Sequence, residues 1–395
     1  MAKLSNLVSS SVMRQSVAAM FNGGSASGLK ATGFTLKNDA FKYVISASSL
    51  TYDIVNGELK GFPTGEVTGL KVLNAAGKLQ FNITGLSLNA ADFPSLSDSA
   101  SALKLLGALT ALDWTVTGTS KANEIRFNAE NGLYSDNGVK ITALGGNDTL
   151  AGGTGDDTIS GGKGNDRIED SAGNDSLLGD IGNDKIVQVK GAAGDDTMDG
   201  GIGNDRIDGG VGHDSLIGGV GDDTLNGGAG NDTMDGGANN DLMTGGAGND
   251  SMSAGLGDDR MKGQAGNDTL LADVGKDTLD GGSGNDRLEG GDGGDKLIGG
   301  TGDDQLYGGV HADTLTGGAG ADDFHFATGD GTDLITDFAA GEDRIFIQMS
   351  AEDELRIIDK NGDAVVIYGD SRVTLDGVSS ELLVMGENLV VETLL

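Results

Sequence analysis

The stretch GGIGNDRID (residues 200–208) is followed directly by GGVGHDSLI (209–217) and GGVGDDTLN (218–226). These nonapeptides share the pattern G-G-x-G-x-D-x-U-x, in which U is a large apolar residue. In this frame, five units cover residues 143–187 and fifteen cover 191–325, with an interruption at 188–190. A strict nine-residue period over such a length predicts a repeat architecture in which each unit packs against its neighbours.

The nine positions of the unit have different residue preferences. All twenty units carry Asp at position six and an apolar residue at position eight. Position four is Gly in eighteen units, where a backbone without Cβ can turn sharply at positive φ. Position five is Asn or Asp in fifteen units, and these residues tolerate the left-handed region. We therefore predict a turn at positions one to six and a short strand at positions seven to nine, with position eight facing inward.

Such short strands must be stabilised by stacking. If two nonapeptides make one coil, their strands lie in two opposite parallel sheets, and each coil adds about 4.8 Å. The inward side chains then form a thin core, which four methionines at position eight are expected to fill, namely Met234, Met243, Met252 and Met261. The turns form two columns of carboxylate and carbonyl oxygens, which are the hard ligands that Ca²⁺ takes.

Composition and charge agree with a cation-binding repeat. The 395 residues include 71 Gly, 2 Pro and no Cys, which argues against a disulfide scaffold and an ordinary enzyme core. The formal charge of −35 makes nucleic acid and anionic membranes poor partners. No apolar run approaches the ~18 residues of a membrane span. With one ion between turns two units apart, the roll takes roughly 16 Ca²⁺, so we expect disorder without calcium and a compact roll with it.

The units resemble those of the RTX (repeats-in-toxin, haemolysin-type) family, which Gram-negative bacteria export through the type I secretion apparatus, and the resemblance covers residues 143–395. It implies an all-β protein with a right-handed parallel β-roll that folds on meeting calcium outside the cell. It also implies that the position-six aspartates are the metal ligands, namely Asp148, Asp157, Asp166, Asp175, Asp184, Asp196, Asp205, Asp214, Asp223, Asp232, Asp241, Asp250, Asp259, Asp268, Asp277, Asp286, Asp295, Asp304, Asp313 and Asp322.

The sequence after the last unit is similar to the segment that closes RTX rolls, at residues 324–326, 331–338 and 343–345. Three aspartates of this tail lie outside the nonapeptide frame, which supports no site for them: Asp330, Asp333 and Asp337. Residues 326–395 are predicted to form a β cap with strands at 355–358, 364–368 and 372–375. The ending Glu392-Thr393-Leu394-Leu395 is similar to an uncleaved type I secretion signal.

Residues 1–117 lack the repeat and are predicted to form a small β-rich domain. Alternating apolar residues predict antiparallel strands at 41–46, 50–55, 67–72 and 79–88. One helix is predicted over 100–112. Residues 118–142 are interpreted as degenerate units that cap the roll. The first 22 residues lack the apolar region of a cleaved secretory signal.

The motifs of common catalytic sites are absent from the sequence. The only histidines are His213, His311 and His325, so the H-E-x-x-H zinc motif cannot occur. The chain also lacks G-x-S-x-G, a phosphate-binding loop and any cysteine nucleophile. His213 and His311 fall at turn positions, where a turn-forming role is expected. We therefore predict a non-enzymatic protein.

Two roles remain open at this point. The first is an extracellular scaffold, such as a surface-layer, biofilm-matrix or adhesive protein, whose rolls self-associate because solenoid ends can add neighbours. The alternative is an adhesin module in which residues 1–117 bind a polysaccharide or a cell surface. A toxin or a hydrolase is less well supported. The interruption at 188–190 predicts a local bulge or a lost site between the two stacks.

Overall fold

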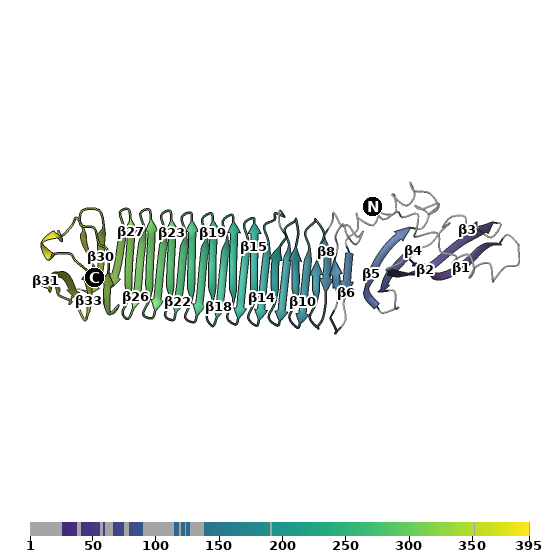
Figure 1. The fold of residues 1–395 in the computed structure, drawn as a ribbon, viewed down its shortest axis with the longest axis horizontal. Coiled ribbons are helices and arrows are strands. Elements are labelled where there is room, and N and C mark those ends of the chain that lie inside the picture. The colour runs from purple at the N-terminus through teal and green to yellow at the C-terminus, as the bar shows by residue number, and fades with distance from the viewer. Residues whose placement is uncertain are drawn as a thin grey trace. The chain divides into compact units, whose positions relative to one another are not determined.

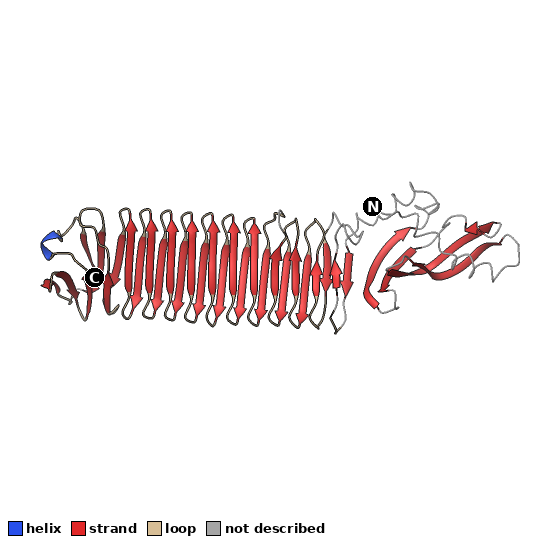
Figure 2. Ribbon diagram, viewed as in Figure 1, coloured by secondary structure: helices blue, strands red, loops and turns tan. Residues whose placement is uncertain are grey.

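The computed structural model divides into two compact units, Met1–Ser176 and Leu177–Leu395. Most regular elements in the described part of the chain are β-strands (Figure 2). No helix among the described residues is long and apolar enough to cross a membrane. The helix expected over 100–112 lies outside the described residues, which are 26–37, 41–55, 58–59, 66–74, 79–89, 114–117, 120–122, 124–126, 138–189, 192–350 and 352–394.

The first unit begins with antiparallel strands, namely β1 (Ala26–Lys37), β2 (Phe41–Val55), β3 (Glu58–Leu59), β4 (Glu66–Asn74) and β5 (Leu79–Asn89). β2 pairs with β1, β3 and β4, and β4 pairs with β5. The strands expected at 67–72 and 79–88 are present. The segments 41–46 and 50–55 form one strand, in which a register shift follows Ser46. A bulge of this kind lets one long strand replace two short ones.

The repeat architecture of the first unit begins with β6 (Trp114–Thr117), which pairs antiparallel with β5 and parallel with β8 (Val139–Thr142). Further along, β8 pairs in parallel with β10 (Thr158–Lys163), and β9 (Thr149–Ala151) pairs with both β7 (Glu124–Arg126) and β11 (Arg167–Asp170). Successive strands thus alternate between two sheets, and one coil contains two nonapeptides. β7 and β8 fall within the predicted capping segment and keep the register of the repeat.

The second unit continues this alternation (Figure 1). Even-numbered strands from β14 to β28 pair in parallel, and odd-numbered strands from β13 to β27 pair in parallel in the other sheet. The strands are β12 (Ser176–Ile181), β13 (Lys185–Gln188), β14 (Thr197–Ile202), β15 (Arg206–Val211), β16 (Ser215–Val220), β17 (Thr224–Ala229), β18 (Thr233–Ala238), β19 (Leu242–Ala247), β20 (Ser251–Leu256), β21 (Arg260–Ala265), β22 (Thr269–Val274), β23 (Thr278–Ser283), β24 (Arg287–Asp292), β25 (Lys296–Thr301), β26 (Gln305–Val310), β27 (Thr314–Ala319) and β28 (Asp323–Ala327).

The predicted strand boundaries were wrong. A complete strand has six residues and runs from position seven to position three of the next unit, as in β15. Positions one and two are mostly glycine, and strand pairing between coils extends through them to position three. Gly210 at position two pairs with Gly228, and Val211 at position three pairs with Ala229. Position two shares the positive φ expected at position four, with 94° at Gly210. The turn is therefore reduced to positions four to six.

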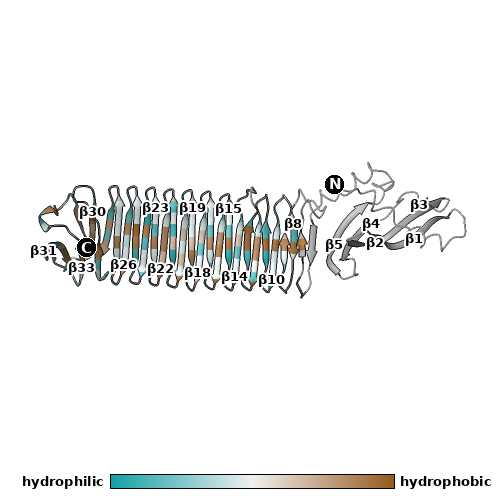
Figure 3. Cartoon of the chain, viewed as in Figure 1, coloured by the Kyte–Doolittle hydropathy of each residue, from teal (hydrophilic) through white to brown (hydrophobic). Residues whose placement is uncertain are grey.

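The core of the roll consists of the position-eight side chains, each at most 1% exposed. Figure 3 shows these apolar residues as brown bands that alternate with more hydrophilic neighbours along the strands. The four methionines named above lie in this core with 0–1% exposure, as does Met198 at the same position of its unit, which confirms their packing role. One apolar side chain per nine residues makes the core thin.

The interruption at 188–190 disturbs one strand locally. β13 ends at Gln188 after four residues, and the carbonyl of Val189 accepts a hydrogen bond from the N–H of Ala192 at 2.9 Å. Nevertheless, the N–H of Asp184 donates to Oδ1 of Asp205 at 2.6 Å, as in uninterrupted coils. The irregularity expected at 188–190 is therefore present in β13, which is shortened, while the hydrogen bond between Asp184 and Asp205 is kept.

The C-terminal cap adds strands to both sheets. β29 (Thr332–Ile335) pairs with β27 and β33, and β30 (Arg344–Ser350) pairs with β28 and β34. The three predicted cap strands are confirmed as β31 (Leu355–Lys360), β32 (Asp363–Tyr368) and β33 (Ser371–Leu375), which pair antiparallel. A 3-10 helix (Ser380–Leu382) precedes β34 (Leu389–Leu394), so the end of the proposed secretion signal forms the last strand.

Replacing a core methionine tests the thin core. We expect Met243→Ala to cost about 2–5 kcal/mol of unfolding free energy in calcium, because the methyl group left behind cannot fill the site between neighbouring coils. Met243→Leu conserves volume and should cost less than about 1.5 kcal/mol. Thermal unfolding of both variants at one calcium concentration measures the difference, and equal losses would contradict the packing assigned to this position.

Candidate metal centre

The position-six aspartates, which the sequence predicted as ligands, all lie inside the roll. Each of the twenty is at most 3% exposed. Each follows the turn at positions four and five and precedes a strand, so the side chain is held at the inner corner of its coil. A carboxylate is rarely buried to this extent unless it is paired with a cation or binds a metal.

In most of these aspartates, one carboxylate oxygen joins successive coils. In the second unit, the N–H of Asp214 donates to Oδ1 of Asp232 at 2.9 Å, and the N–H of Asp232 donates to Oδ1 of Asp250 at 2.8 Å. The same contact links Asp148 to Asp166 at 2.7 Å in the first unit. Each coil therefore donates a buried backbone N–H to the carboxylate of the next coil.

The second carboxylate oxygen has no such partner along most of the second unit. Oδ2 is buried and accepts no hydrogen bond from the described residues in fourteen aspartates: Asp205, Asp214, Asp223, Asp232, Asp241, Asp250, Asp259, Asp268, Asp277, Asp286, Asp295, Asp304, Asp313 and Asp322. None of these fourteen forms an ion pair with a described Lys, Arg or His. Buried polar atoms are nearly always satisfied, so this column of oxygens is suited to hold cations.

Carbonyl oxygens lie close to these carboxylates. A methyl carbon placed on Gly227 would lie 2.3 Å from Oδ2 of Asp232 and 2.7 Å from the carbonyl oxygen of Gly245. The two oxygens come from successive coils and lie near a common point, so one ion can contact both. Carboxylate and carbonyl oxygens together are the donor set of Ca²⁺, whose ligands lie at about 2.3–2.6 Å. The residues present therefore fit calcium.

The electrostatics of the columns are unfavourable without a cation. Burial raises the pKa of Asp214, Asp241 and Asp277 to about 7, and the carboxylates of neighbouring coils raise it as well. The backbone N–H that each receives lowers the pKa but does not compensate. At neutral pH the folded roll thus holds charges that would be more stable in water, and a bound divalent cation removes this penalty.

Position five has a different role from the one predicted. Its Asn and Asp residues do not take positive φ in the described units. Their side chains instead accept hydrogen bonds from the next coil, as when the N–H of Asn267 donates to Oδ1 of Asn249 at 2.8 Å. His213 takes the same role, because its Nδ1 accepts the N–H of Asn231 at 2.8 Å. The turn-forming role expected of His311 is confirmed by its φ of 93°, whereas the side chain of His213 connects two coils.

Two aspartates of the tail occupy positions equivalent to position six. Oδ1 of Asp333 accepts the N–H of Asp313 at 3.0 Å, and Oδ1 of Asp343 accepts the N–H of Asp322 at 3.1 Å. The frame missed them because insertions change the spacing to 20 and 21 residues. The signal that could have found them is the retained G-x-D-x-U core, as in Gly331-Thr332-Asp333-Leu334-Ile335.

These features define the class of the protein as a calcium-binding parallel β-roll. The family model of the RTX calcium-binding nonapeptide repeat matches residues 142–169, 161–187, 188–216, 217–252, 253–288 and 289–324. Residues 142–324 therefore carry RTX calcium-binding nonapeptide repeats, as the sequence indicated. No curated protein matches the chain.

The solved structures to which the chain is similar include two bacterial proteins. One is the extracellular lipase LipA of Serratia marcescens, with 18% identity and a TM-score of 0.20 over 68% of this chain. The chain spans 42% of the length of that lipase. The other is a hyperactive, Ca²⁺-dependent, β-helical antifreeze protein from an Antarctic bacterium, with 19% identity and a TM-score of 0.30 over 59% of this chain and 86% of that protein.

The raised pKa values predict how pH affects the metal-free roll. The ordinary pKa is 3.8 and the folded values are about 6 to 7, so protons bind more tightly in the folded state. Without calcium, the roll should be most stable below about pH 4 and should lose stability as the pH rises through 6 to 7. Circular dichroism between pH 3.5 and 8 measures this loss, and strand content independent of pH in calcium-free buffer would contradict it.

A single substitution separates the two roles of the carboxylate. In Asp232→Asn, Oδ1 can still accept the N–H of Asp214, while the new amide can donate to the carbonyl of Gly245. The variant should therefore be less stable than the parent in calcium, by about 1–3 kcal/mol, and more stable than the parent without it. Thermal unfolding of the variant and the parent, with and without calcium, tests whether the difference in their stability changes sign.

The matched control is Asp235→Asn, three residues away at the outward position nine, where the side chain is exposed. It removes the same charge without touching the column and should behave like the parent in both conditions. If Asp232→Asn were equally destabilising with and without calcium, the carboxylate would have only a structural role.

Proposed function

We propose that this protein is a secreted, non-enzymatic scaffold whose roll folds when the position-six aspartates bind calcium. The observation that supports calcium-dependent folding is the column of buried Oδ2 atoms without hydrogen-bond partners. A chain of charge −35 with one apolar core residue per nonapeptide gains little from folding alone. Roughly 16 bound Ca²⁺ would supply the missing stability and nearly neutralise the chain.

Export follows from the same property. RTX proteins are typically secreted by Gram-negative bacteria, and a roll that is unfolded at low calcium can pass a secretion apparatus as an extended chain. Extracellular calcium modules bind with dissociation constants near 10⁻⁴–10⁻³ M, so millimolar calcium outside the cell would then fold the roll. Calcium binding would thus restrict folding of the roll to the outside of the cell.

The scaffold role is supported by an exposed apolar column along one edge of the roll. Position three of the even-numbered strands carries large apolar residues that are 40–58% exposed: Ile202, Val220, Leu256, Val274 and Val310. We call these five residues the apolar edge. They lie in line because strand pairing places Ile202 opposite Val220 and Leu256 opposite Val274. Ala238 lies between Val220 and Leu256, and Asp292 lies between Val274 and Val310, so the apolar edge consists of two adjacent pairs and one single residue. Exposed apolar side chains that adjoin one another mark interaction surfaces.

The other edge of the roll lacks this feature. Position three of the odd-numbered strands carries one large apolar residue, Val211 in β15, which is 50% exposed. From β17 to β27 it carries small or polar residues, namely Ala229, Ala247, Ala265, Ser283, Thr301 and Ala319. We propose that a second copy of this chain covers the apolar edge. The edge repeats with the coil, so the edge of another copy has the same period and can pack against it about a two-fold axis. Bound calcium would remove the repulsion between two chains of charge −35.

Light scattering and electron microscopy at about 1 mM calcium test this role. The parent should form dimers or larger assemblies in calcium, because burying the apolar edge removes apolar surface from water. The double variant Val220→Ser/Leu256→Ser should stay monomeric while its circular dichroism spectrum still shows a folded roll. The control Ala229→Ser/Ala247→Ser changes the other edge and should assemble like the parent. A parent that is folded and monomeric at every concentration would refute the scaffold.

A further inference from the structure

A row of stacked aromatic side chains lies on the outer face of the even-numbered sheet, at its C-terminal end. Tyr307 and His325 occupy position nine of successive coils, and strand pairing continues the row to Phe346 in β30. The ring centroids of Tyr307 and His325 lie 4.2 Å apart, and those of His325 and Phe346 lie 4.7 Å apart. Their planes differ by 9° and 11°, so the three rings are nearly parallel. We call these three residues the ring row.

Packing of the core does not explain the ring row. The cap has aromatic residues of its own inside the fold, since Phe324 and Phe338 are buried with ring centroids 6.2 Å apart. The side chains of the ring row are only half-buried and lie on the opposite face of the sheet. None of the other eighteen units carries an aromatic residue or a histidine at position nine. Aromatic side chains gathered on an outer face in this way mark a place where another molecule binds.

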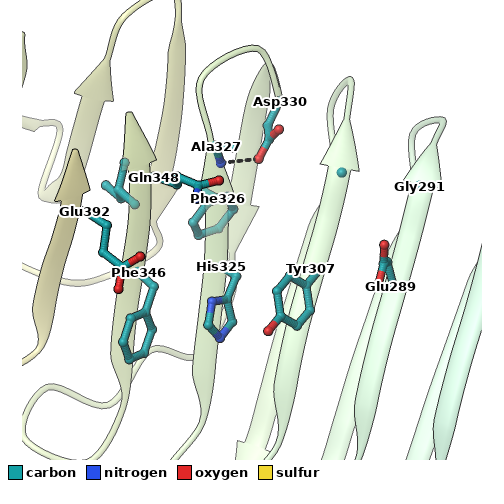
Figure 4. A pocket seen from close by; sticks show the side chains of 12 residues that line it. Glu289, Gly291, Tyr307, His325, Phe326, Ala327, Asp330, Phe346, Gln348 and Glu392 are labelled. Carbon is teal, nitrogen blue, oxygen red and sulfur yellow. Dashed lines mark hydrogen bonds between the residues drawn. The ribbon is translucent and has the colours of Figure 1, made fainter. Parts of the chain in front are cut away.

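A cavity of about 470 Å³ lies beside the ring row (Figure 4). Gly291 and Gly309, at position two of their units, line it with bare backbone. A methyl carbon on Gly309 would lie 2.1 Å from the carbonyl oxygen of Gly291, so this position has no room for a side chain. The hollow therefore arises because glycines alternate with large rings along the strands. Its volume falls in the range of about 300–1,000 Å³ that is typical of ligand sites.

The polar groups that line the cavity are three carboxylates and one carboxamide, namely Glu289, Asp330, Glu392 and Gln348. Figure 4 shows Glu392 beside Phe346, and Gln348 and Asp330 near Ala327. Carboxylates accept hydrogen bonds from hydroxyl groups, and a carboxamide both donates and accepts. No lysine or arginine is among the described residues that line the cavity. The cavity therefore disfavours phosphate, sulfate and other anionic groups.

The carboxylates are poorly placed to select a cation. Glu289 pairs with Arg287 at 2.8 Å, and Asp330 accepts the N–H of Ala327. Glu392 has no ion pair or hydrogen bond among the described residues, but its side chain is exposed, where a single ion pair contributes little. An uncharged ligand that donates hydroxyl groups can use all three carboxylates without displacing Arg287.

The orientation of the rings also favours an uncharged ligand rich in oxygen. Their faces are turned toward one another, and Arg287 and Arg344 lie over the rings of Tyr307 and Phe346 at 3.9 Å and 5.2 Å from the centroids. A further cation thus finds no open ring face. Burial lowers the pKa of His325, which keeps its ring uncharged at neutral pH. The ring edges that border the cavity carry partial positive charge, which attracts oxygen atoms and repels cations.

We propose that the cavity beside the ring row binds a neutral glycan, whose hydroxyl groups donate to Asp330 and Glu392 and exchange hydrogen bonds with Gln348. Its C–H groups and ring oxygens pack against the edges of the ring row. Gln348 and Glu392 are exposed, so the cavity is open to solvent and can take part of a longer sugar chain. The site goes beyond the proposed function because it gives the roll a ligand other than calcium and a second copy. It lies outside residues 1–117, where the alternative role placed polysaccharide binding.

An array of immobilised neutral, acidic and cationic glycans tests the class of ligand. The full-length protein is applied in about 1 mM calcium, after circular dichroism has shown that the roll is folded. The matched pair on the array is an oligomer of N-acetylglucosamine and the same oligomer without its acetyl groups, which is cationic. We expect retention on neutral glycans. A folded protein that is retained on no neutral glycan, or only on acidic or cationic ones, would overturn the site.

Substitutions in the cavity test its place in the fold. Tyr307→Ala and Gln348→Ala should each weaken binding of the best neutral glycan roughly tenfold in titration calorimetry. The matched control is Ile217→Ala, which removes an apolar side chain at position nine of β16, away from the cavity, and should bind like the parent. Equal affinity of all three variants would overturn the site.

A last comparison separates the glycan site from the scaffold role. The variant Val220→Ser/Leu256→Ser should bind the glycan with the affinity of the parent even where it no longer assembles, because the cavity belongs to a single chain. Loss of glycan binding in this folded variant would contradict a site built by one chain. Failure of the parent to assemble would refute the scaffold and leave the glycan result standing.

Discussion

The buried carboxylate at position six is the constraint on which the rest of the roll depends. Its Oδ1 accepts a backbone N–H from the preceding coil, so the stack cannot form without it. Its Oδ2 is buried at the same corner without a partner in fourteen units. A buried charge without a counterion costs several kcal/mol, and twenty such aspartates far exceed the stability of an ordinary domain. The side chain that connects the coils thus makes them depend on a cation.

The other positions of the nonapeptide follow from this arrangement. Glycines at positions one and two bring the backbones of successive coils together, and they leave position eight as the main source of apolar core. The free energy gained by burying one apolar side chain per unit cannot offset the cost of burying one charged carboxylate per unit. We therefore propose that folding is coupled to the calcium concentration around the chain, and the edges of the roll are free to differ. The edge of the even-numbered strands carries most of the large exposed apolar side chains, so the surface proposed to bind a second copy is separate from the interior that binds ions.

Much of this could be predicted from sequence, because a fixed period identifies position six and position eight without knowledge of the fold. Strand boundaries could not, since Gly210 and Gly228 have low strand propensity and pair only because stacked coils place them together. The role of Asn249 at position five depends on Asn267, eighteen residues away, which no local rule considers. The nine-residue frame did not identify Asp333 and Asp343 because insertions change their spacing from the preceding aspartate to 20 and 21 residues.

The most direct test of the account is amide hydrogen exchange measured along the full-length chain at pH 7, with millimolar calcium and with a chelator. The buried N–H groups of the position-six aspartates, such as Asp214 and Asp232, donate to the carboxylates of the next coil and report on the columns themselves. The account predicts that they are protected in calcium and exchange as in an unfolded chain without it. Equal protection in both conditions would show that the carboxylate columns are stable without a cation and would contradict the account.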